Sequence, residues 1–270
     1  MKSFVRFIVY SNIFVAFCVL GLSISSEILL DIANYKVSQF VFFATLFAYN
    51  FQRIVWLSKT KDHVRKDWFN KNKLAVFSLI VISAIMSGYS FFDFKTNTQF
   101  LIVFSGVISV LYPFGLREIP FSKIFIISLV WTISTMLLLV LENNIPFDSN
   151  ILFHLLSRFL FIFSITIPFD IRDLKFDDKK LKTIPIIIGE SRAKLLAVLA
   201  LLIAEALYVI QYWLNQILPQ HLIGIIILFL ITSFVIMKSS EKKSDFYYSI
   251  CVESMSLLLY LILGISTLML

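Results

Sequence analysis

Three aspartates at helical spacing are the residues of this sequence whose types could do chemistry together. Asp170, Asp173 and Asp177 follow a long apolar run. On a helix, this spacing places the three carboxylates within an arc of about 60° over two turns. Like charges this close need a compensating cation, and hard oxygen ligands suit Mg²⁺, which is usually bound by a few carboxylates together with substrate phosphates. The spacing indicates a metal-bridged phosphate site.

The same acidic segment also has a plainer interpretation. It could be the solvated end of a membrane helix, in which Asp177 pairs with Lys180 and Asp178 pairs with Lys182 at ordinary helical spacing. Spacing alone favours neither interpretation over the other.

Polar groups that could bind phosphate also stand at the ends of two other apolar runs. Asn50 and Arg53 are three residues apart, on one helical face, and Tyr112 and Arg117 follow another run. Polar groups at membrane depth are costly unless they are paired or face a water-filled cavity. Arg53 could instead extend to the headgroups, and Tyr112 and Arg117 could mark the interface. We favour a substrate-facing role for Asn50 and Arg53. Asn12, inside the first apolar run, is expected to bond a neighbouring helix.

The elements that position these residues are membrane spans. The sequence is 59% hydrophobic and only 15% charged, whereas about a quarter of the residues of a soluble domain are charged. A spanning helix needs about 20 mostly apolar residues. We predict an all-α polytopic membrane protein with a single domain over residues 1–270, whose nine spans cover residues 4–24, 37–57, 74–92, 98–114, 121–141, 151–167, 193–217, 221–237 and 246–270. Pro168 is expected to kink or end the sixth span.

The net charge of +7 is explained by the membrane and not by nucleic acid. With the N-terminus inside, 21 of the 24 Lys and Arg residues fall in the inner segments, two (Lys36 and Lys95) fall in the outer loops, and Arg158 lies inside a span. This bias places the N-terminus and residues 170–194 in the cytoplasm and the C-terminus outside. We expect the lipid bilayer to be the bacterial inner membrane.

Residues 170–189 resemble the second aspartate-rich motif of the UbiA superfamily of intramembrane prenyltransferases. That motif reads broadly as an acidic or amide residue, Arg-Asp, three residues, Asp, then Thr, an apolar residue, Pro and Gly. The matching residues here are Asp170, Arg172, Asp173, Asp177, Thr183, Pro185 and Gly189. Leu181 departs from the pattern, because the family commonly has a glycine before the Lys-Thr pair that Lys182 and Thr183 match. The stretch Leu111-Tyr112-Pro113 with Arg117 is similar to the family's turn after helix 4, so the resemblance covers essentially the whole chain.

The resemblance implies a helical bundle around a central cavity that opens to the cytoplasmic side. In the family, Mg²⁺ held by two acidic motifs grips a polyprenyl diphosphate, and ionisation of the C–O bond yields an allylic cation that an aromatic or other small acceptor captures. Metal and cationic side chains would stabilise the departing diphosphate.

The first acidic motif of the family is incomplete in this chain. Its Asn aligns with Asn50, but Phe51, Ile54 and Ser58 stand at the aspartate positions. We therefore hypothesise that one Mg²⁺ binds Asp170, Asp173 and Asp177, with Asp173 and Asp177 as the catalytic pair. The resemblance and the charges together assign the diphosphate to Asn50, Arg53, Tyr112, Arg117, Arg172 and Lys182, since guanidinium groups suit phosphate oxygens.

Three function classes stay open from the sequence. A divergent prenyltransferase is favoured, and a non-catalytic relative that binds an isoprenoid or a membrane partner is the alternative, because the first motif is incomplete. A transporter or channel is the third class, suggested by Glu205, Glu253 and Arg158 within spans.

Overall fold

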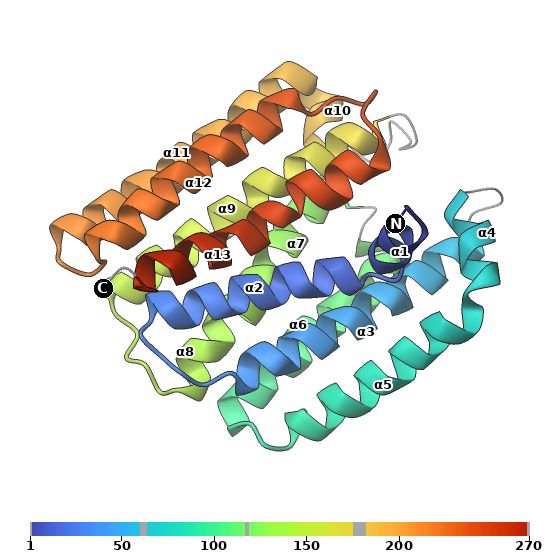
Figure 1. Ribbon diagram of the computed structural model, residues 1–270, viewed down its shortest axis with the longest axis horizontal. Coiled ribbons are helices and arrows are strands. Elements are labelled where there is room, and N and C mark those ends of the chain that lie inside the picture. Colours follow the sequence, from blue (N-terminus) through green and yellow to red (C-terminus); the bar gives the residue numbers. More distant parts are fainter. Residues whose placement is uncertain (1, 60–63, 117–118, 175–181, 269–270) are drawn as a thin grey trace.

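A computed structural model describes residues 2–59, 64–116, 119–174 and 182–268 of the chain (Figure 1). The secondary structure of these ranges is helical. In chain order the helices are α1 (Lys2–Tyr10), α2 (Ile13–Leu29), α3 (Lys36–Lys59), α4 (Val64–Lys71), α5 (Lys73–Phe91), α6 (Thr96–Leu111), η1 (Tyr112–Phe114), α7 (Ser122–Thr132), η3 (Ile133–Leu137), α8 (Leu138–Glu142), α9 (Ser149–Asp173), α10 (Ile184–Ile188), α11 (Glu190–Trp213), α12 (Pro219–Lys238), η5 (Tyr247–Val252) and α13 (Ser254–Leu268).

The predicted membrane spans are present as long apolar helices. Eight stretches of the described chain are long and apolar enough to cross a membrane, and they match the second to ninth predicted spans within a few residues at most of their ends. The predicted first span is instead a pair of helices, Ser3–Tyr10 and Ile13–Leu29, which meet at 63°. A count of nine spans is reached only when this bent pair is taken as one.

Two asparagines hold the bend between α1 and α2. Asn12 adopts the left-handed conformation at φ 61°, and its side-chain amide donates to Asn50 Oδ1 of α3 at 3.0 Å. Asn50 Nδ2 in turn donates to the carbonyl oxygens of Ser11 at 2.9 Å and Leu46 at 2.9 Å. The predicted bond from Asn12 to a neighbouring helix is thus confirmed, and its partner is Asn50.

The longest helix, α9, lies in the middle of the bundle and packs along α7 and α11, while α13 packs against α2 and α12 (Figure 1). Buried Arg158 of α9 reaches α2 by donating to Leu22 O at 3.1 Å, Ser25 Oγ at 3.0 Å and Ser26 Oγ at 2.8 Å. Because its guanidinium joins two helices, Arg158 has a structural explanation that needs no transport pathway.

Pro168 does not end its helix. The helix α9 continues through it to Asp173. Proline removes only the hydrogen bond to the carbonyl of Ser164, and the surrounding packed helices hold the last turn in place. Asp170 and Asp173 are therefore both carried on the final turn of α9.

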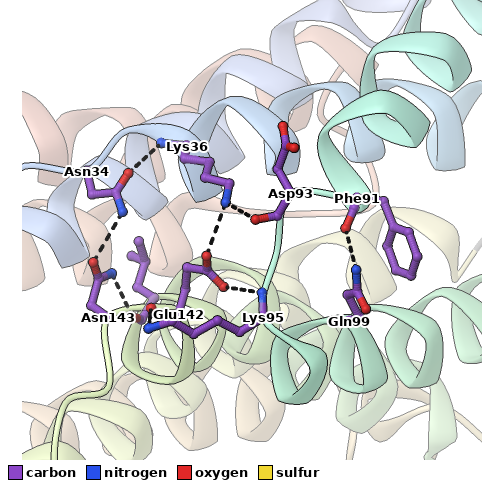
Figure 2. A network of polar contacts seen from close by, with 9 residues as sticks. Asn34, Lys36, Phe91, Asp93, Lys95, Gln99, Glu142 and Asn143 are labelled. Atoms are coloured by element: carbon purple, nitrogen blue, oxygen red, sulfur yellow. Dashed lines mark hydrogen bonds and ion pairs between the residues drawn. The ribbon is translucent and has the colours of Figure 1, made fainter.

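A polar network fastens the opposite end of the bundle, where α3 begins, α5 connects to α6 and α8 ends (Figure 2). The Glu142 carboxylate contacts Lys36 Nζ at 3.2 Å and accepts from the backbone N–H of Lys95 at 3.1 Å. Lys36 Nζ also donates to the carbonyl of Asp93, and Lys95 Nζ donates to the carbonyl of Glu142 at 2.6 Å. Both predicted outer lysines thus contact the Glu142 carboxylate, Lys36 through its ammonium and Lys95 through its backbone N–H.

Candidate functional site

A cavity of about 1130 Å³ opens among α3, α5, α6 and α7 and extends to the last turn of α9. Among the described residues, the charged ones that line it are Arg53, Lys123, Arg172, Asp173 and Asp245. The remainder of its wall is largely apolar and aromatic. The cavity therefore combines a charged region with an apolar one.

Lys123, the second residue of α7, is at the centre of the charged region. Its Nζ lies 2.7 Å from Asp170 Oδ1 and 2.9 Å from Asp173 Oδ2. The Lys123 side chain is 12% exposed and that of Asp170 only 1%. Since α7 packs along α9, the ammonium is held between the two aspartates of the final α9 turn.

Arg172 is held on the other side of Asp173. Its Nε donates to Asp173 Oδ1 at 2.7 Å. Its guanidinium carbon lies 5.2 Å from the ring centre of Phe169 and 5.7 Å from that of Tyr248. These ring faces attract the cation, so Arg172 is oriented by a carboxylate and two rings.

The end of α3 and the start of η1 bring further polar groups to the same cavity. Arg53 and Tyr112 both line it, and the Arg53 guanidinium lies 5.7 Å from the ring centre of Trp56. Gln52 Nε2 donates to the carbonyl of Ser109 at 2.8 Å, which ties α3 to α6 beside the cavity. The structure thus brings together four predicted site residues, namely Arg53, Tyr112, Arg172 and Asp173.

Other predicted site residues lie elsewhere. Asn50 is 1% exposed and is absent from the cavity wall, because its amide is engaged with Asn12, Ser11 and Leu46. Lys182 is exposed at φ 44° and is also absent from the wall.

Three predicted residues remain to be placed. Asp170 is buried behind Lys123 and does not itself line the cavity. Arg117 and Asp177 lie outside the described residues.

The sequence did not predict two charged residues, Lys123 and Asp245, as part of the site. Lys123 contributes to the inner positive charge but belongs to no recognisable motif, and Asp245 stands just before the last span. The local signal for each is a charged residue at the edge of an apolar run, which names no partner. Their place in the site depends on how the helices pack.

The apolar region is widened by small residues and walled by aromatic ones. Ala84, Ser87 and Gly88 of α5 line it, and a Cβ added to Gly88 would meet no atom within 4 Å. On the opposite helices, Trp131 Nε1 donates to the hydroxyl of Tyr49 at 3.1 Å. This wall suits an extended hydrocarbon chain.

The two described aspartates do not fit the predicted magnesium site as they are arranged here. Within the described ranges, no group of three or more His, Cys, Asp and Glu side chains could hold a metal ion. Mg²⁺ needs near-octahedral oxygen ligands at about 2.0–2.1 Å. The Lys123 ammonium occupies the position between Asp170 and Asp173 that a shared metal ion would take.

Comparisons with known proteins agree with this fold. The UbiA prenyltransferase family matches the sequence over residues 70–258. No curated protein sequence matches the chain.

Several solved structures share the fold. A UbiA homolog from Archaeoglobus fulgidus bound to DMAPP and Mg²⁺ matches with a TM-score of 0.66 at 14% identity, over 98% of this chain and 100% of that chain. The apo structure of a UbiA homolog from Aeropyrum pernix K1 matches with a TM-score of 0.65 at 12% identity, over 94% of this chain and 97% of that chain. A digeranylgeranylglyceryl phosphate synthase matches with a TM-score of 0.62 at 17% identity, over the full length of both chains. At these identities the similarity establishes the fold.

Proposed function

Because this chain belongs to the UbiA prenyltransferase family, we propose that it transfers a prenyl group from a polyprenyl diphosphate to an aromatic or other small acceptor. The observation that carries the proposal is the cavity, in which Arg53, Lys123 and Arg172 lie at one region and the rest of the wall is apolar and aromatic. A prenyl diphosphate has the same two parts, an anionic head and a hydrocarbon chain.

The proposed reaction needs charge stabilisation more than covalent chemistry. The C–O bond of the donor breaks, and its electron pair leaves with the diphosphate. Guanidinium and ammonium groups bind the growing negative charge through short charge-assisted hydrogen bonds. The resulting allylic cation is attacked by the acceptor, which then loses a proton.

The cation must also be kept from water. Tyr49 and Trp131 line the cavity, and aromatic rings can stabilise a positive charge while excluding solvent. Their mutual hydrogen bond fixes the two side chains relative to each other.

In this proposal Arg53, Tyr112 and Arg172 bind the diphosphate, and Asp173 orients Arg172. Arg117, Lys182 and Asp177 stay predictions from the sequence, and Asn50 is assigned to the α1–α2 bend. The proposed reaction gives no role to Mg²⁺ at Asp170 and Asp173, because their carboxylates contact Lys123 and Arg172.

We further propose that the protein lies in the bacterial inner membrane with the charged region of the cavity on the cytoplasmic side. Lys36 and Arg53 support this arrangement, since they are at opposite ends of α3, about 25 Å apart along the helix. Lys36 and Lys95, which both contact Glu142, thus lie at the end of the bundle opposite to Arg53.

A non-catalytic isoprenoid-binding protein is the second candidate. It is favoured by one observation, namely that Phe51, Ile54 and Ser58 stand where the family has the aspartates of its first motif. Turnover separates the two functions, whereas binding does not.

The test is binding and turnover of radiolabelled geranyl diphosphate by the purified protein in lipid nanodiscs. Arg53→Ala should weaken binding by about tenfold or more, the effect of losing one charged hydrogen-bond donor. Arg192→Ala is the matched control, because Arg192 is exposed on α11 and absent from the cavity wall. Pyrophosphate release on addition of aromatic acceptors would establish the transferase.

Either of two results would change this assignment. Binding that Arg53→Ala leaves unaltered, with no pyrophosphate released, would reject the proposal. Binding that depends on Arg53 without release from any acceptor would favour the non-catalytic candidate.

A further inference from the structure

The contacts of Lys123 are those of a cation shared by two carboxylates. Its Nζ lies within 3 Å of one oxygen from each of Asp170 and Asp173, and the same side chain lines the cavity. A metal ion bound by two carboxylates and facing a substrate would have this same relation to its surroundings.

Both aspartates of this region have cationic partners within the described chain. The ammonium of Lys123 contacts Asp170 and Asp173, and the guanidinium of Arg172 contacts Asp173 from its other side. Each of the two carboxylates is therefore already paired with a positive side chain.

Exchange of the ammonium for a metal would be costly. A metal that bridged Asp170 and Asp173 would have to break two ion pairs and displace Lys123, whose side chain is only 12% exposed. Breaking a buried pair leaves an uncompensated charge, and such a charge is expensive within a membrane protein. The arrangement therefore favours the lysine over the ion.

We infer that the Lys123 ammonium replaces the divalent metal between Asp170 and Asp173, so that this protein binds a prenyl diphosphate without a divalent cation. This inference rests on the proposed function, because it concerns the same diphosphate. Lys123 has a double role, as counter-ion of the aspartates and as a direct donor to the diphosphate.

The first test needs only the wild-type protein. Binding of radiolabelled geranyl diphosphate is measured in EDTA and in excess Mg²⁺, and the two values of Kd should agree within about threefold. Electron paramagnetic resonance of added Mn²⁺ should show no ion bound at stoichiometric amount. Stoichiometric Mn²⁺ binding at this site by the wild type would overturn the inference.

The second test removes the ammonium so that a metal ion can bind between the two aspartates. Lys123→Met keeps an unbranched side chain but removes the charge, so binding in EDTA should weaken by about tenfold or more. The freed carboxylates should then accept a metal, so Mg²⁺ should restore binding and Mn²⁺ should become bound. Lys194→Met is the matched control, since Lys194 is paired with Glu190 at 2.6 Å but is absent from the cavity wall.

A double variant provides a further test in case Lys123→Met folds poorly. Lys123→Met with Asp170→Asn removes one positive and one negative charge together, so it leaves no unpaired Asp170 carboxylate. It should bind the diphosphate as weakly as the single variant in EDTA, but Mg²⁺ should restore it less because one ligand is lost. Full restoration would contradict the assignment of Asp170 as the second partner of the ion.

The outcomes separate this inference from the proposed function. Wild-type binding that appears only with Mg²⁺ would overturn the inference and leave the proposed function standing. Failure to bind prenyl diphosphates both with and without Mg²⁺ would reject the proposed function, and the inference with it.

Discussion

Asn50 shows how much one amide can be committed to structure inside an apolar helix. Its alignment with a motif residue, one turn before Arg53, predicts a contact with the diphosphate. In the structure its side chain makes three hydrogen bonds, to Asn12, Ser11 and Leu46. Arg53, three residues later, does face the cavity. Residue type thus indicated a polar role at both positions, and the packing gives Asn50 buried hydrogen-bond partners while Arg53 lines the cavity.

We predict that Asn50→Ala lowers the free energy of unfolding by about 1–3 kcal/mol, because it leaves buried groups of Asn12 and Ser11 without their partner. The Kd for geranyl diphosphate should stay within about twofold of the wild-type value. Denaturant unfolding in detergent micelles and the binding assay give the two quantities. Asn97→Ala is the control, because Asn97 is exposed.

The opposite pattern would restore the interpretation drawn from the motif. Weakened diphosphate binding by an Asn50→Ala protein of unchanged stability would show that Asn50 contacts the substrate.

At the scale of elements, α5 and α6 set the width of the cavity. Both present small residues to it, including Gly88 of α5 and Gly106 of α6, and a Cβ at either position would meet no atom within 4 Å. Both helices are also largely exposed. Because neither glycine is required by close backbone contact, each is a place where a side chain could fill the space open to a prenyl chain.

We predict that Gly88→Leu restricts the donor to shorter chains. A leucine side chain would occupy part of the apolar region and leave less room for a long prenyl chain. The Kd for a twenty-carbon prenyl diphosphate should therefore rise by about tenfold relative to the Kd for the five-carbon donor. A change of this size corresponds to the exclusion of one or two apolar groups. Competition binding with both donors measures the ratio.

Gly264→Leu is the matched control for this change. Gly264 lies in α13, its added Cβ also meets no atom within 4 Å, and it does not line the cavity. If Gly88→Leu weakened the binding of both donors equally, the substitution would act by disturbing the helix. It would then not select donors by prenyl chain length.

Across the whole molecule, the two ends of the bundle carry separate polar clusters. At one end, Lys36 and Lys95 contact Glu142 (Figure 2). The other end carries the cluster of Lys123, Asp173 and Arg172. In the proposed orientation, which follows the positive-inside rule, this cluster would lie on the cytoplasmic side.

We predict that a cysteine at Asp93 reacts with a membrane-impermeant maleimide in intact cells, whereas a cysteine at Lys242 reacts only after permeabilisation. Both positions are exposed in the structure. The substitutions are made in a protein whose Cys18 and Cys251 are replaced by serine. Labelling of Lys242→Cys in intact cells would reverse the proposed orientation.

The spans could be predicted from the sequence alone, because a helix in lipid needs a continuous apolar run whose length can be read locally. It also placed Asp170 and Asp173 on one helical turn, since that depends on spacing alone. The bend between α1 and α2 was missed, because it depends on Asn12 meeting Asn50, 38 residues away.

The partners of Asp170 and Asp173 depend on helix packing and could not be read from the sequence. Lys123 and Asp173 are 50 residues apart in the chain, and they meet because α7 packs along α9. Which face of each helix turns inward is a property of the whole bundle, in which lipid and protein surroundings are almost equally apolar. For that reason the sequence predicted Mg²⁺ at these carboxylates, whereas in the described structure Asp170 and Asp173 contact Lys123.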